Sequence, residues 1–384
     1  MKKKIAILGS TGSIGKCLID IIKKDKRNFE IILLSADENY KELLNQAKFF
    51  KVKNLIITNT KSFNKIKKDK YSKKIKIHNN FDGLGKIFRK KIDYTMSSIS
   101  GIQGLKPTIE IIKHTKKIAI ANKEAIICGW DLIEKRLNKH KTKFIPIDSE
   151  HFSIWYALQD IEKNLIEKVY LTASGGPFLD KSIKNLKKVN IKQVTNHPNW
   201  KMGRKISVDS ASMLNKGLEL LEAKHLFGIP ARSIDVVIHP ESIVHSMVEY
   251  KDGSILAQMG NPDMRIPIAH GLAWPDRTPS AASKLDLTKK GLHFEEPDYG
   301  KFPCLSIARE IADEPQSHSI ALNAANEVAV DAFLSEQIRF IDIPTIIRDV
   351  LEKTKAEEVH TIEIVLELDG KARKLATEGI RHAL

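Results

Sequence analysis

Short apolar runs alternate with longer amphipathic segments through residues 1–147. The apolar runs have the length of buried strands: Ile5–Leu8, Ile31–Ser35, Leu55–Thr58, Tyr94–Ser97, Ile118–Ala121 and Phe144–Pro146. Between several of them apolar residues recur at helical spacing, as in Gly15–Lys24 and Tyr40–Phe50. This alternation predicts a parallel sheet covered by helices, a doubly wound, Rossmann-like α/β domain.

The pattern changes after residue 147. Four further strands are expected at Val169–Ala173, Val236–His239, Ile243–Glu249 and Ser254–Gln258, and they predict an open mixed sheet in a central α+β domain at residues 148–273. Residues 274–303 have several prolines and little periodicity, so we expect a connecting segment. Helical patterns at Ser306–Asp313, His318–Ser335, Ile343–Lys353 and Thr361–Ile380 predict a C-terminal helical bundle within residues 304–384.

The composition is that of an ordinary globular protein with a strongly basic first half. Residues 1–200 contain 41 Lys and Arg against 19 Asp and Glu, whereas residues 201–384 contain 22 against 28. The lysine runs have few interleaved aromatic residues and no groove-binding motif accompanies them. We therefore interpret them as solvated faces that attract anionic ligands, and expect no nucleic-acid partner.

The spacing of the cysteines and the length of the apolar runs bear on the cellular location of the protein. Cys17, Cys128 and Cys304 lie far apart and form no CxxC pair, which favours a reducing environment and argues against a zinc site. The apolar run after the N-terminal lysines is too short for a signal peptide, and no run reaches membrane-spanning length. We expect a cytoplasmic protein with no membrane partner.

A glycine-rich turn follows the first predicted strand. It reads Gly9, Ser10, Thr11, Gly12, Ser13, Ile14, Gly15 and opens a helix, whose free N–H groups suit a pyrophosphate. The spacing is GxxGxxG rather than GxGxxG, so an ordinary strand–helix turn is the alternative. The second strand should end at the adenosine ribose, where the chain reads Ala36, Asp37, Glu38, Asn39. Acidic residues there favour a free 2′-hydroxyl, hence NAD over NADP.

Three carboxylates suit a hard metal ion. Asp148 and Glu150 follow a predicted strand, and extended geometry would point both the same way, with Ser149 facing elsewhere. Asn215 and Glu219 are four apart on a predicted helix and share a face. Carboxylates without Cys or paired His favour Mg²⁺ or Mn²⁺ over zinc, although an isolated D-x-E pair is common on surfaces.

Donors suited to a phosphate surround this set. Ser174, followed by Gly175 and Gly176, resembles a turn that a ligand can approach, and His197, Ser210, Asn215 and Lys216 add further donors. Each of these residues also has an ordinary structural explanation, such as a helix cap for Ser210.

The segment His197–Gly203 contains a large aromatic residue between helix breakers. Trp200 lies between Pro198 and Gly203. It either anchors the loop to the core or contacts substrate as part of a lid that excludes water.

Together these motifs resemble those of the 1-deoxy-D-xylulose-5-phosphate reductoisomerases. The matching segments span essentially the whole chain and are Gly9–Gly15, Asn122–Glu124, Asp148–His151, Ser174–Phe178, His197–Gly203, Ser207–Ser210, Asn215–Glu219, His239–His245, Gly260–Arg265 and Ala321–Glu327. The resemblance implies a homodimer that rearranges 1-deoxy-D-xylulose 5-phosphate and reduces the product with NADPH to 2-C-methyl-D-erythritol 4-phosphate, using Mn²⁺, Mg²⁺ or Co²⁺.

The resemblance also implies residue roles. The metal ligands would be Asp148, Glu150 and Glu219, which would also act catalytically with Lys123 and His197. Substrate contacts would come from Lys123, Ser149, Glu150, Ser174, His197, Ser210, Asn215, Lys216 and Glu219. Cofactor contacts would come from Thr11, Gly12, Ser13, Ile14, Asn122, Glu124, Gly203 and Met264. One departure is visible: the family usually has Gly and a basic residue before Asn39, where this chain has Asp37 and Glu38. A nearby lysine such as Lys41 is the alternative source of a contact to a 2′-phosphate.

Two rival functions explain less of the chain. A semialdehyde or sugar-phosphate dehydrogenase could share the glycine-rich start, but a semialdehyde dehydrogenase needs a nucleophilic cysteine in a polar motif, and Cys128 and Cys304 have no such surroundings. A lysine-rich nucleotide- or nucleic-acid-binding protein would show salt-sensitive retention on polyanions. Neither accounts for the three carboxylates.

Overall fold

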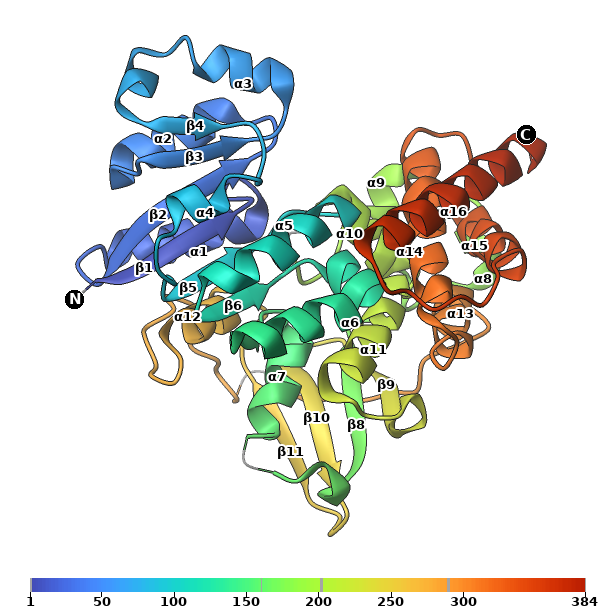
Figure 1. Cartoon of the computed structure of the whole chain (residues 1–384). Helices are drawn as coiled ribbons and strands as arrows, with labels where there is room; N and C mark the ends of the chain where they lie inside the picture. The colour runs from blue at the N-terminus through green and yellow to red at the C-terminus, as the bar shows by residue number, and fades with distance from the viewer. Residues whose placement is uncertain (1, 160, 201–202, 289–290, 384) are drawn as a thin grey trace. The chain divides into compact units, whose positions relative to one another are not determined.

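A parallel sheet of seven strands, in the order β4-β3-β2-β1-β5-β6-β7, forms the centre of the N-terminal part of the chain. The computed structural model (Figure 1) describes residues 2–159, 161–200, 203–288 and 291–383. The strands are β1 Lys3–Leu8, β2 Phe29–Ala36, β3 Asn54–Ile57, β4 Lys76–His78, β5 Tyr94–Ser97, β6 Lys117–Ile120 and β7 Lys143–Pro146. The strand order confirms the predicted doubly wound arrangement.

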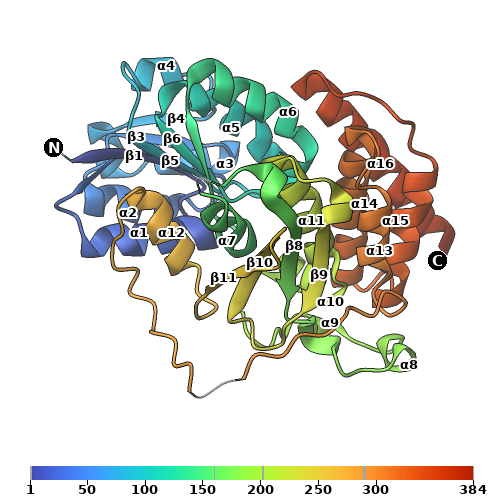
Figure 2. The ribbon, with the colours of Figure 1, turned by 90° about the horizontal axis from the view of Figure 1, so that it is seen from below.

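Helices cover both faces of this sheet (Figure 2). They are α1 Ser13–Lys24, α2 Tyr40–Phe50, α3 Thr60–Ile66, α4 Leu84–Ile87, α5 Leu105–Ile111, α6 Lys123–His140 and α12 Arg265–Ala273. One face is buried by α1, α2 and α12, whose residues Leu18, Leu43, Ile268 and Leu272 join a single core with the strands. These strands read as continuous apolar runs because both of their faces are buried.

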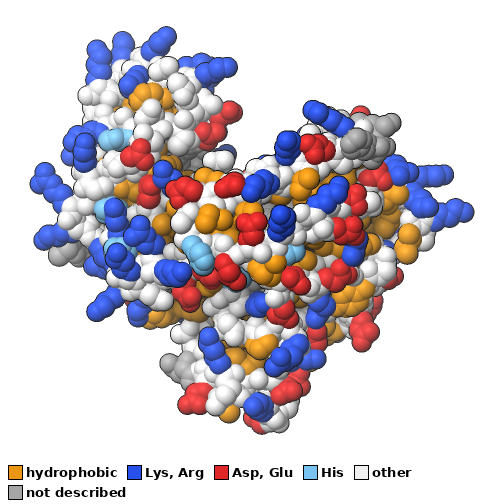
Figure 3. All heavy atoms as spheres, turned by 45° about the vertical axis from the view of Figure 1, so that its right-hand side comes forward, with side chains coloured by type: hydrophobic (Ala, Val, Ile, Leu, Met, Phe, Trp, Pro, Cys, Tyr) orange, Lys and Arg blue, Asp and Glu red, His pale blue; other side chains and the backbone are white. Residues whose placement is uncertain are grey.

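Two compact units make up the chain. The first consists of Met1–Ala125, Asp131–Asp148 and Asp263–Ala282, and the second of Ile126–Trp130, Ser149–Pro262 and Ser283–Leu384. Helix α12 therefore belongs to the first unit although it follows most of the second in sequence. Lys and Arg side chains are spread over much of the N-terminal surface in Figure 3, in keeping with the basic first half of the sequence.

The second unit contains a four-stranded mixed sheet and a helical bundle. The sheet has the order β11-β10-β8-β9, with β8 parallel to β9 and the other two pairs antiparallel. Its strands are β8 Ile166–Ala173, β9 Ile234–Ile238, β10 Val244–Tyr250 and β11 Ile255–Met259. Its helices are α7 Ser149–Ala157, α8 Ile183–Leu186, α9 Ile191–Val194, α10 Arg204–Ala211, α11 Leu214–Phe227, α13 Pro303–Glu310, α14 Gln316–Leu334, α15 Ile343–Glu352 and α16 Ile362–Ala383.

The predicted elements are confirmed, apart from shifted ends and omissions such as β4 and the short helices. Helices α14, α15 and α16 pack on one another as the expected C-terminal bundle, and α7 packs on β10 and β11. Among the described residues, no helix is both long enough and apolar enough to cross a membrane.

Candidate active site

Three carboxylates converge where β7 leads into α7. Asp148 precedes α7, Glu150 lies in its first turn, and Glu219 is buried on α11. One oxygen from each of the three lies within 4.8 Å of the others. The grouping was predicted, but its predicted cause was wrong: Ser149 and Glu150 are helical rather than extended, and Ser149 does not face elsewhere, because its hydroxyl donates to Glu150 Oε2 at 2.7 Å. The first turn of a helix, not a strand, brings Glu150 towards Glu219.

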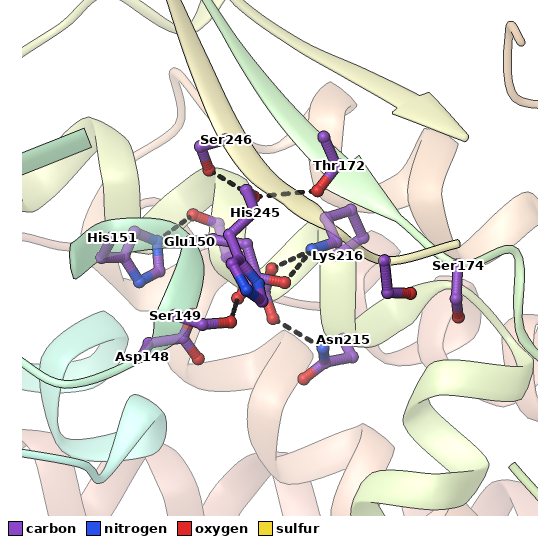
Figure 4. A network of polar contacts seen from close by, with 12 residues as sticks. Asp148, Ser149, Glu150, His151, Thr172, Ser174, Asn215, Lys216, His245 and Ser246 are labelled. Atoms are coloured by element: carbon purple, nitrogen blue, oxygen red, sulfur yellow. Dashed lines mark hydrogen bonds and ion pairs between the residues drawn. The ribbon is translucent and has the colours of Figure 1, made fainter. Parts of the chain in front are cut away.

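Lys216 is the buried cation of this cluster (Figure 4). Its Nζ lies 2.7 Å from Glu150 Oε1 and also pairs with Glu219 Oε2. Burial acts to lower the pKa of Lys216, but the two carboxylates outweigh burial and hold it above its ordinary value. Asn215 Nδ2 donates to Glu219 Oε1 at 2.6 Å, which confirms that these two side chains share a face of α11. Lys216 thus places a positive charge beside Glu150 and Glu219.

The donor set fits a hard divalent ion. Three carboxylates supply only oxygen ligands, which Mg²⁺ and Mn²⁺ prefer. In a second group, Asp148, His151 and Glu222, one ligand atom of each residue also lies within 4.8 Å of the others. We favour the first group because all of its ligands are oxygens, as hard ions prefer. In the second group, His151 Nε2 lies 2.9 Å from the Glu219 carbonyl oxygen and its Nδ1 lies 3.3 Å from Glu222 Oε2.

A second polar cluster surrounds Ser174, directly after β8. Gly175 and Gly176 have φ of +78° and +66°, and a Cβ on Gly176 would lie only 3.0 Å from the carbonyl oxygen of Ser210. Only glycine lets this turn approach α10 so closely. The hydroxyl of Ser174 lies 3.1 Å from His197 Nε2, so two of the predicted phosphate donors are neighbours. The backbone of Ser210, a third predicted donor, lies against the turn at Gly176.

His197 has a defined tautomer. Its Nδ1 accepts the backbone N–H groups of Asn199 and Trp200 at 3.1 and 3.0 Å, so Nε2 carries the proton and donates it to Ser174. Burial lowers the pKa of His197 to about 4. The imidazole is therefore neutral at pH 7 and acts as a hydrogen-bond donor, not as a cation.

Contacts with the segment that follows β9 fix this loop. Asn199 Nδ2 donates to the Pro240 carbonyl oxygen at 2.7 Å and to the Ser242 hydroxyl at 2.8 Å. Trp200 is half-buried, and its ring centroid lies 6.3 Å from that of His245. The remaining loop residues Lys201 and Met202 lie outside the described residues, so the role of Trp200 as a cover stays a prediction.

The glycine-rich turn is held tightly against the parallel sheet. A Cβ on Gly9, whose φ is +81°, would lie 2.5 Å from the Ser98 carbonyl oxygen, and one on Gly15 would lie 2.3 Å from that of Gly9. Helix α1 begins at Ser13 without a side-chain cap or an acidic residue in its first turn, so its N–H groups can receive an anion.

At the end of β2, Asp37, Glu38 and Asn39 are all exposed. Asn39 caps α2, its side-chain oxygen accepting the Glu42 N–H at 3.2 Å.

The comparisons with known proteins agree along the chain. Family models for 1-deoxy-D-xylulose 5-phosphate reductoisomerase match residues 5–129, for its C-terminal domain residues 144–227, and for the DXP reductoisomerase C-terminal domain residues 259–375. The reductoisomerase of Pelagibacter ubique is 46% identical over 89% of both chains, and that of a Wolbachia from Culex pipiens is 42% identical over 99% of this chain and 98% of its own. This chain belongs to the 1-deoxy-D-xylulose 5-phosphate reductoisomerases.

Solved structures of reductoisomerases have the same fold. The Zymomonas mobilis enzyme in complex with NADPH has a TM-score of 0.92 and 38% identity, each chain being covered to 99%. A reductoisomerase in complex with NADPH, fosmidomycin and magnesium has a TM-score of 0.91 and 41% identity, over 99% of this chain and 98% of that one.

Within the first unit, the remaining site residues predicted for a reductoisomerase have clear positions. Lys123 opens α6 and forms a 2.5 Å ion pair with Asp148. Asn122 caps the same helix, its Oδ1 accepting the Ala125 N–H at 2.9 Å, while its Nδ2 donates to the carbonyl oxygens of Ile99 and Gly101. Glu124 lies in the first turn of α6, and Met264 packs against the core of the parallel sheet.

In the second unit, Gly203 is the N-cap of α10, the helix that carries Ser210. The helices on which these predicted contact residues lie are thus known, whereas the contacts that they would make with ligands stay predictions.

Two pairs beneath the reductoisomerase site were not singled out from the sequence. His151 and Glu222 are both buried, and they form one of these pairs. The i,i+3 spacing of Glu219 and Glu222 could have indicated that these two glutamates share a face of α11. Asp209 is buried beside Ser210 and accepts from Asn326 Nδ2 at 2.8 Å, which ties α10 to α14. No local pattern connects residues so far apart in sequence.

The lowered pKa of His197 makes the free energy of unfolding of this reductoisomerase depend on pH. In the unfolded chain a histidine titrates near pH ~6.5, and in the fold its pKa is about 4. Between these values only the unfolded state binds the proton, so the contribution of His197 to stability is complete above pH ~6.5 and is lost as the pH falls towards about 4. We expect His197→Gln to lower the free energy of unfolding more at about pH 7 than at about pH 5, as urea titrations would measure.

A histidine on the surface provides the control. His360 is exposed, and His360→Gln should change the free energy of unfolding little at either pH. An equal loss for His197→Gln at both pH values would contradict the neutral, donating imidazole.

Proposed function

We propose that this chain converts 1-deoxy-D-xylulose 5-phosphate to 2-C-methyl-D-erythritol 4-phosphate by a rearrangement followed by reduction with NADPH. One observation carries the proposal: within a reductoisomerase chain, Asp148, Glu150 and Glu219 form a set that suits a divalent ion, and Lys216 and Asn215 contact the latter two. The unit that contains Glu150 and Glu219 also contains the Ser174–His197 donor pair. A metal ion and a sugar phosphate can both be bound by such residues.

The residues of the chain contribute binding, orientation and charge. When bound, a divalent ion supplies Lewis-acid chemistry for the substrate oxygens. Asp148, Glu150 and Glu219 would hold it, and Asn215 keeps Glu219 oriented through its 2.6 Å hydrogen bond. Ser174 has a hydroxyl oriented by His197, whose low pKa prevents it from adding a charge at neutral pH. The free N–H groups at the start of α1 would receive the pyrophosphate of NADPH.

A spectrophotometric assay tests this proposal. NADPH oxidation should require both 1-deoxy-D-xylulose 5-phosphate and Mg²⁺ or Mn²⁺, and should stop when a chelator is added. Equal oxidation in chelator, or oxidation with a simple semialdehyde in place of the sugar phosphate, would contradict the proposal.

The alternative semialdehyde chemistry has little support in this chain. Cys128 and Cys304 are both buried, and burial raises the pKa of Cys304 to about 12. A nucleophilic cysteine needs the opposite shift towards a thiolate. The sugar-phosphate reaction uses no cysteine, so it fits these thiols better.

The exposed edge of the mixed sheet supports a homodimer. Strand β11 lies at one end of the sheet and exposes Ile255, Leu256 and Met259 by 54%, 49% and 37%. An exposed apolar strand at the edge of a sheet is prone to non-specific pairing with other chains. Pairing with a second copy of this chain would bury it. We propose that the dimer contact lies on this strand.

A lysine on this strand should separate the dimer. A single unpaired charge in a buried interface costs several kcal/mol, so Leu256→Lys should raise the dimer dissociation constant by about 100-fold or more. Light scattering over a dilution series would measure it. Ile183→Lys on α8, where the side chain is 52% exposed, is the matched control and should leave the mass unchanged. A monomeric parent protein, or a Leu256→Lys dimer, would contradict this interface.

In this proposal each segment of the chain has its own binding or structural role. Residues 1–147 would bind NADPH, residues 148–273 would bind the metal and sugar phosphate and form the dimer contact, and residues 304–384 would close one side of the catalytic unit, with 274–303 connecting them. The three cysteines form no disulfide, which agrees with a reducing compartment such as the cytoplasm.

A further inference from the structure

The end of strand β2 carries two acidic residues at the position that sets cofactor specificity in doubly wound nucleotide-binding sheets. In a doubly wound nucleotide-binding sheet, the first strand–helix turn holds the pyrophosphate and the end of the second strand reaches the adenosine ribose. Strands β1 and β2 are paired here, and the turn is fixed directly to β2: Gly9 N–H donates to the Ser35 hydroxyl at 3.0 Å and Ser10 N–H to the Ser35 carbonyl at 2.8 Å. The ribose position therefore falls on Asp37 and Glu38.

Both carboxylates are anchored in place by the neighbouring strand end. Thr58 Oγ1 donates to Asp37 Oδ1 at 2.6 Å, and Asn59 Nδ2 donates to Glu38 Oε1 at 3.3 Å. Backbone contacts from the same two residues, Thr58 N–H to the Ala36 carbonyl and Asn59 N–H to the Asp37 carbonyl, hold the β2 and β3 ends together. The side chains cannot easily turn away from a nucleotide bound at this edge, because each would lose a hydrogen bond.

Their charges are not neutralised locally. Asp37 and Glu38 are exposed, and among the described residues neither has a Lys, Arg or His nitrogen within ion-pair distance. Asp37 Oδ2 accepts no hydrogen bond in the described part of the chain and can receive a ribose hydroxyl. The side-chain oxygen of Asn39 is already engaged as the cap of α2.

The lysine-rich surface does not cancel this effect. Exposed charges are largely screened beyond about 10 Å at ordinary ionic strength, so positive charge elsewhere on the unit adds only a weak preference for NADPH, the more highly charged dinucleotide. Discrimination between a 2′-hydroxyl and a 2′-phosphate depends on the groups in contact with that position. In this chain the residues at the end of β2 are Asp37 and Glu38, both acidic.

We infer that the adenosine site of this chain accepts a free 2′-hydroxyl nearly as well as a 2′-phosphate, so that NADH serves as a second reductant beside NADPH. Asp37 receives the ribose hydroxyls of NADH, while Asp37 and Glu38 both oppose the 2′-phosphate of NADPH. This inference rests on the proposed function for the identity of the reaction, but its own content is the relative affinity of two dinucleotides.

Binding measurements test the inference without turnover. Dissociation constants of NADPH and NADH, from the change in nicotinamide fluorescence on the full chain, should differ by less than about tenfold, because one or two exposed carboxylates oppose whatever attraction the 2′-phosphate gains. The same titrations on Glu38→Lys should show NADPH binding about tenfold tighter, with NADH changed by less than about twofold. Steady-state kcat/KM for the two reductants should follow the same order.

A charge-matched variant separates contact from overall charge. Glu30 is exposed near the opposite end of β2, so Glu30→Lys makes the same change in net charge far from the ribose position. Glu30→Lys should shift both dissociation constants little and equally. A preference for NADPH above about tenfold in the unchanged protein, or equal effects of Glu38→Lys and Glu30→Lys, would overturn the inference. If neither dinucleotide binds, the proposed function itself fails, a result distinct from a failure of specificity alone.

Discussion

Glu150→Gln is expected to abolish turnover while leaving NADPH binding intact. Glutamine keeps the size of the side chain but removes the charge that would hold a divalent ion together with Asp148 and Glu219. Losing several kcal/mol of charge stabilisation corresponds to a fall in kcat/KM on the order of 10³-fold. The nucleotide is expected on the parallel sheet of the other unit, so its dissociation constant should stay within about twofold, well under the tenfold that 1.4 kcal/mol would produce.

The matched control for this substitution is Glu167→Gln. Glu167 is exposed on β8 in the same unit, and its neutralisation should leave kcat/KM unchanged. Calorimetric titration with Mn²⁺ should show weakened binding for Glu150→Gln only. Near-normal activity of Glu150→Gln in chelator-treated buffer would show that the metal assignment is wrong.

Lys216→Met should have a stability effect that depends on the metal. In the chelated protein, the substitution leaves Glu150 and Glu219 without the cation that now pairs with both. Removing one partner of a buried ion pair costs about 3–5 kcal/mol, so the free energy of unfolding in chelator should fall by roughly that amount. Saturating Mn²⁺ should recover much of the loss, because the ion replaces the missing positive charge.

Turnover of Lys216→Met should stay low even with the metal, since the substrate phosphate would lose a proposed cationic contact. Urea titrations with and without Mn²⁺ give the stability difference. Lys224→Met on the same helix is the control: its Nζ pairs with the exposed Asp313 and donates to the Ala312 carbonyl oxygen, so any stability loss should be the same with and without Mn²⁺. An equal stability loss for Lys216→Met with and without Mn²⁺ would contradict the role of Lys216 as the alternative counter-charge.

Much of the fold follows from local pattern. Strands buried on both faces, such as β1 and β5, are short apolar runs bounded by turn residues, and local sequence is enough to place them. Strand β4 was missed because its three residues, Lys76–His78, contain one apolar side chain. Residues 148–150 were misjudged as extended because a carboxylate pair at i,i+2 suits a strand and the helix start has no marked local signal.

Some features of the candidate site also follow from local sequence, whereas others depend on tertiary packing. The predicted set of carboxylates and donors relied on motifs, and the i,i+4 relation of Asn215 and Glu219 on a helix is a local rule that the structure confirms. The His151–Glu222 and Asp209–Asn326 pairs depend on tertiary packing, the latter between residues 117 apart. Such pairs have no periodic signature in the sequence, so only the three-dimensional structure reveals them.

The position of α12 has a consequence for how this protein is made. Ile268, Ala269 and Leu272 complete the core under the parallel sheet, yet they are translated after the whole of segment Ser149–Pro262. A ribosome therefore releases the glycine-rich turn and all seven strands long before the helix that finishes burying them. Until then, part of an apolar sheet face stays exposed to chaperones and to other nascent chains, so the nucleotide-binding unit cannot mature strictly from the N-terminus onward.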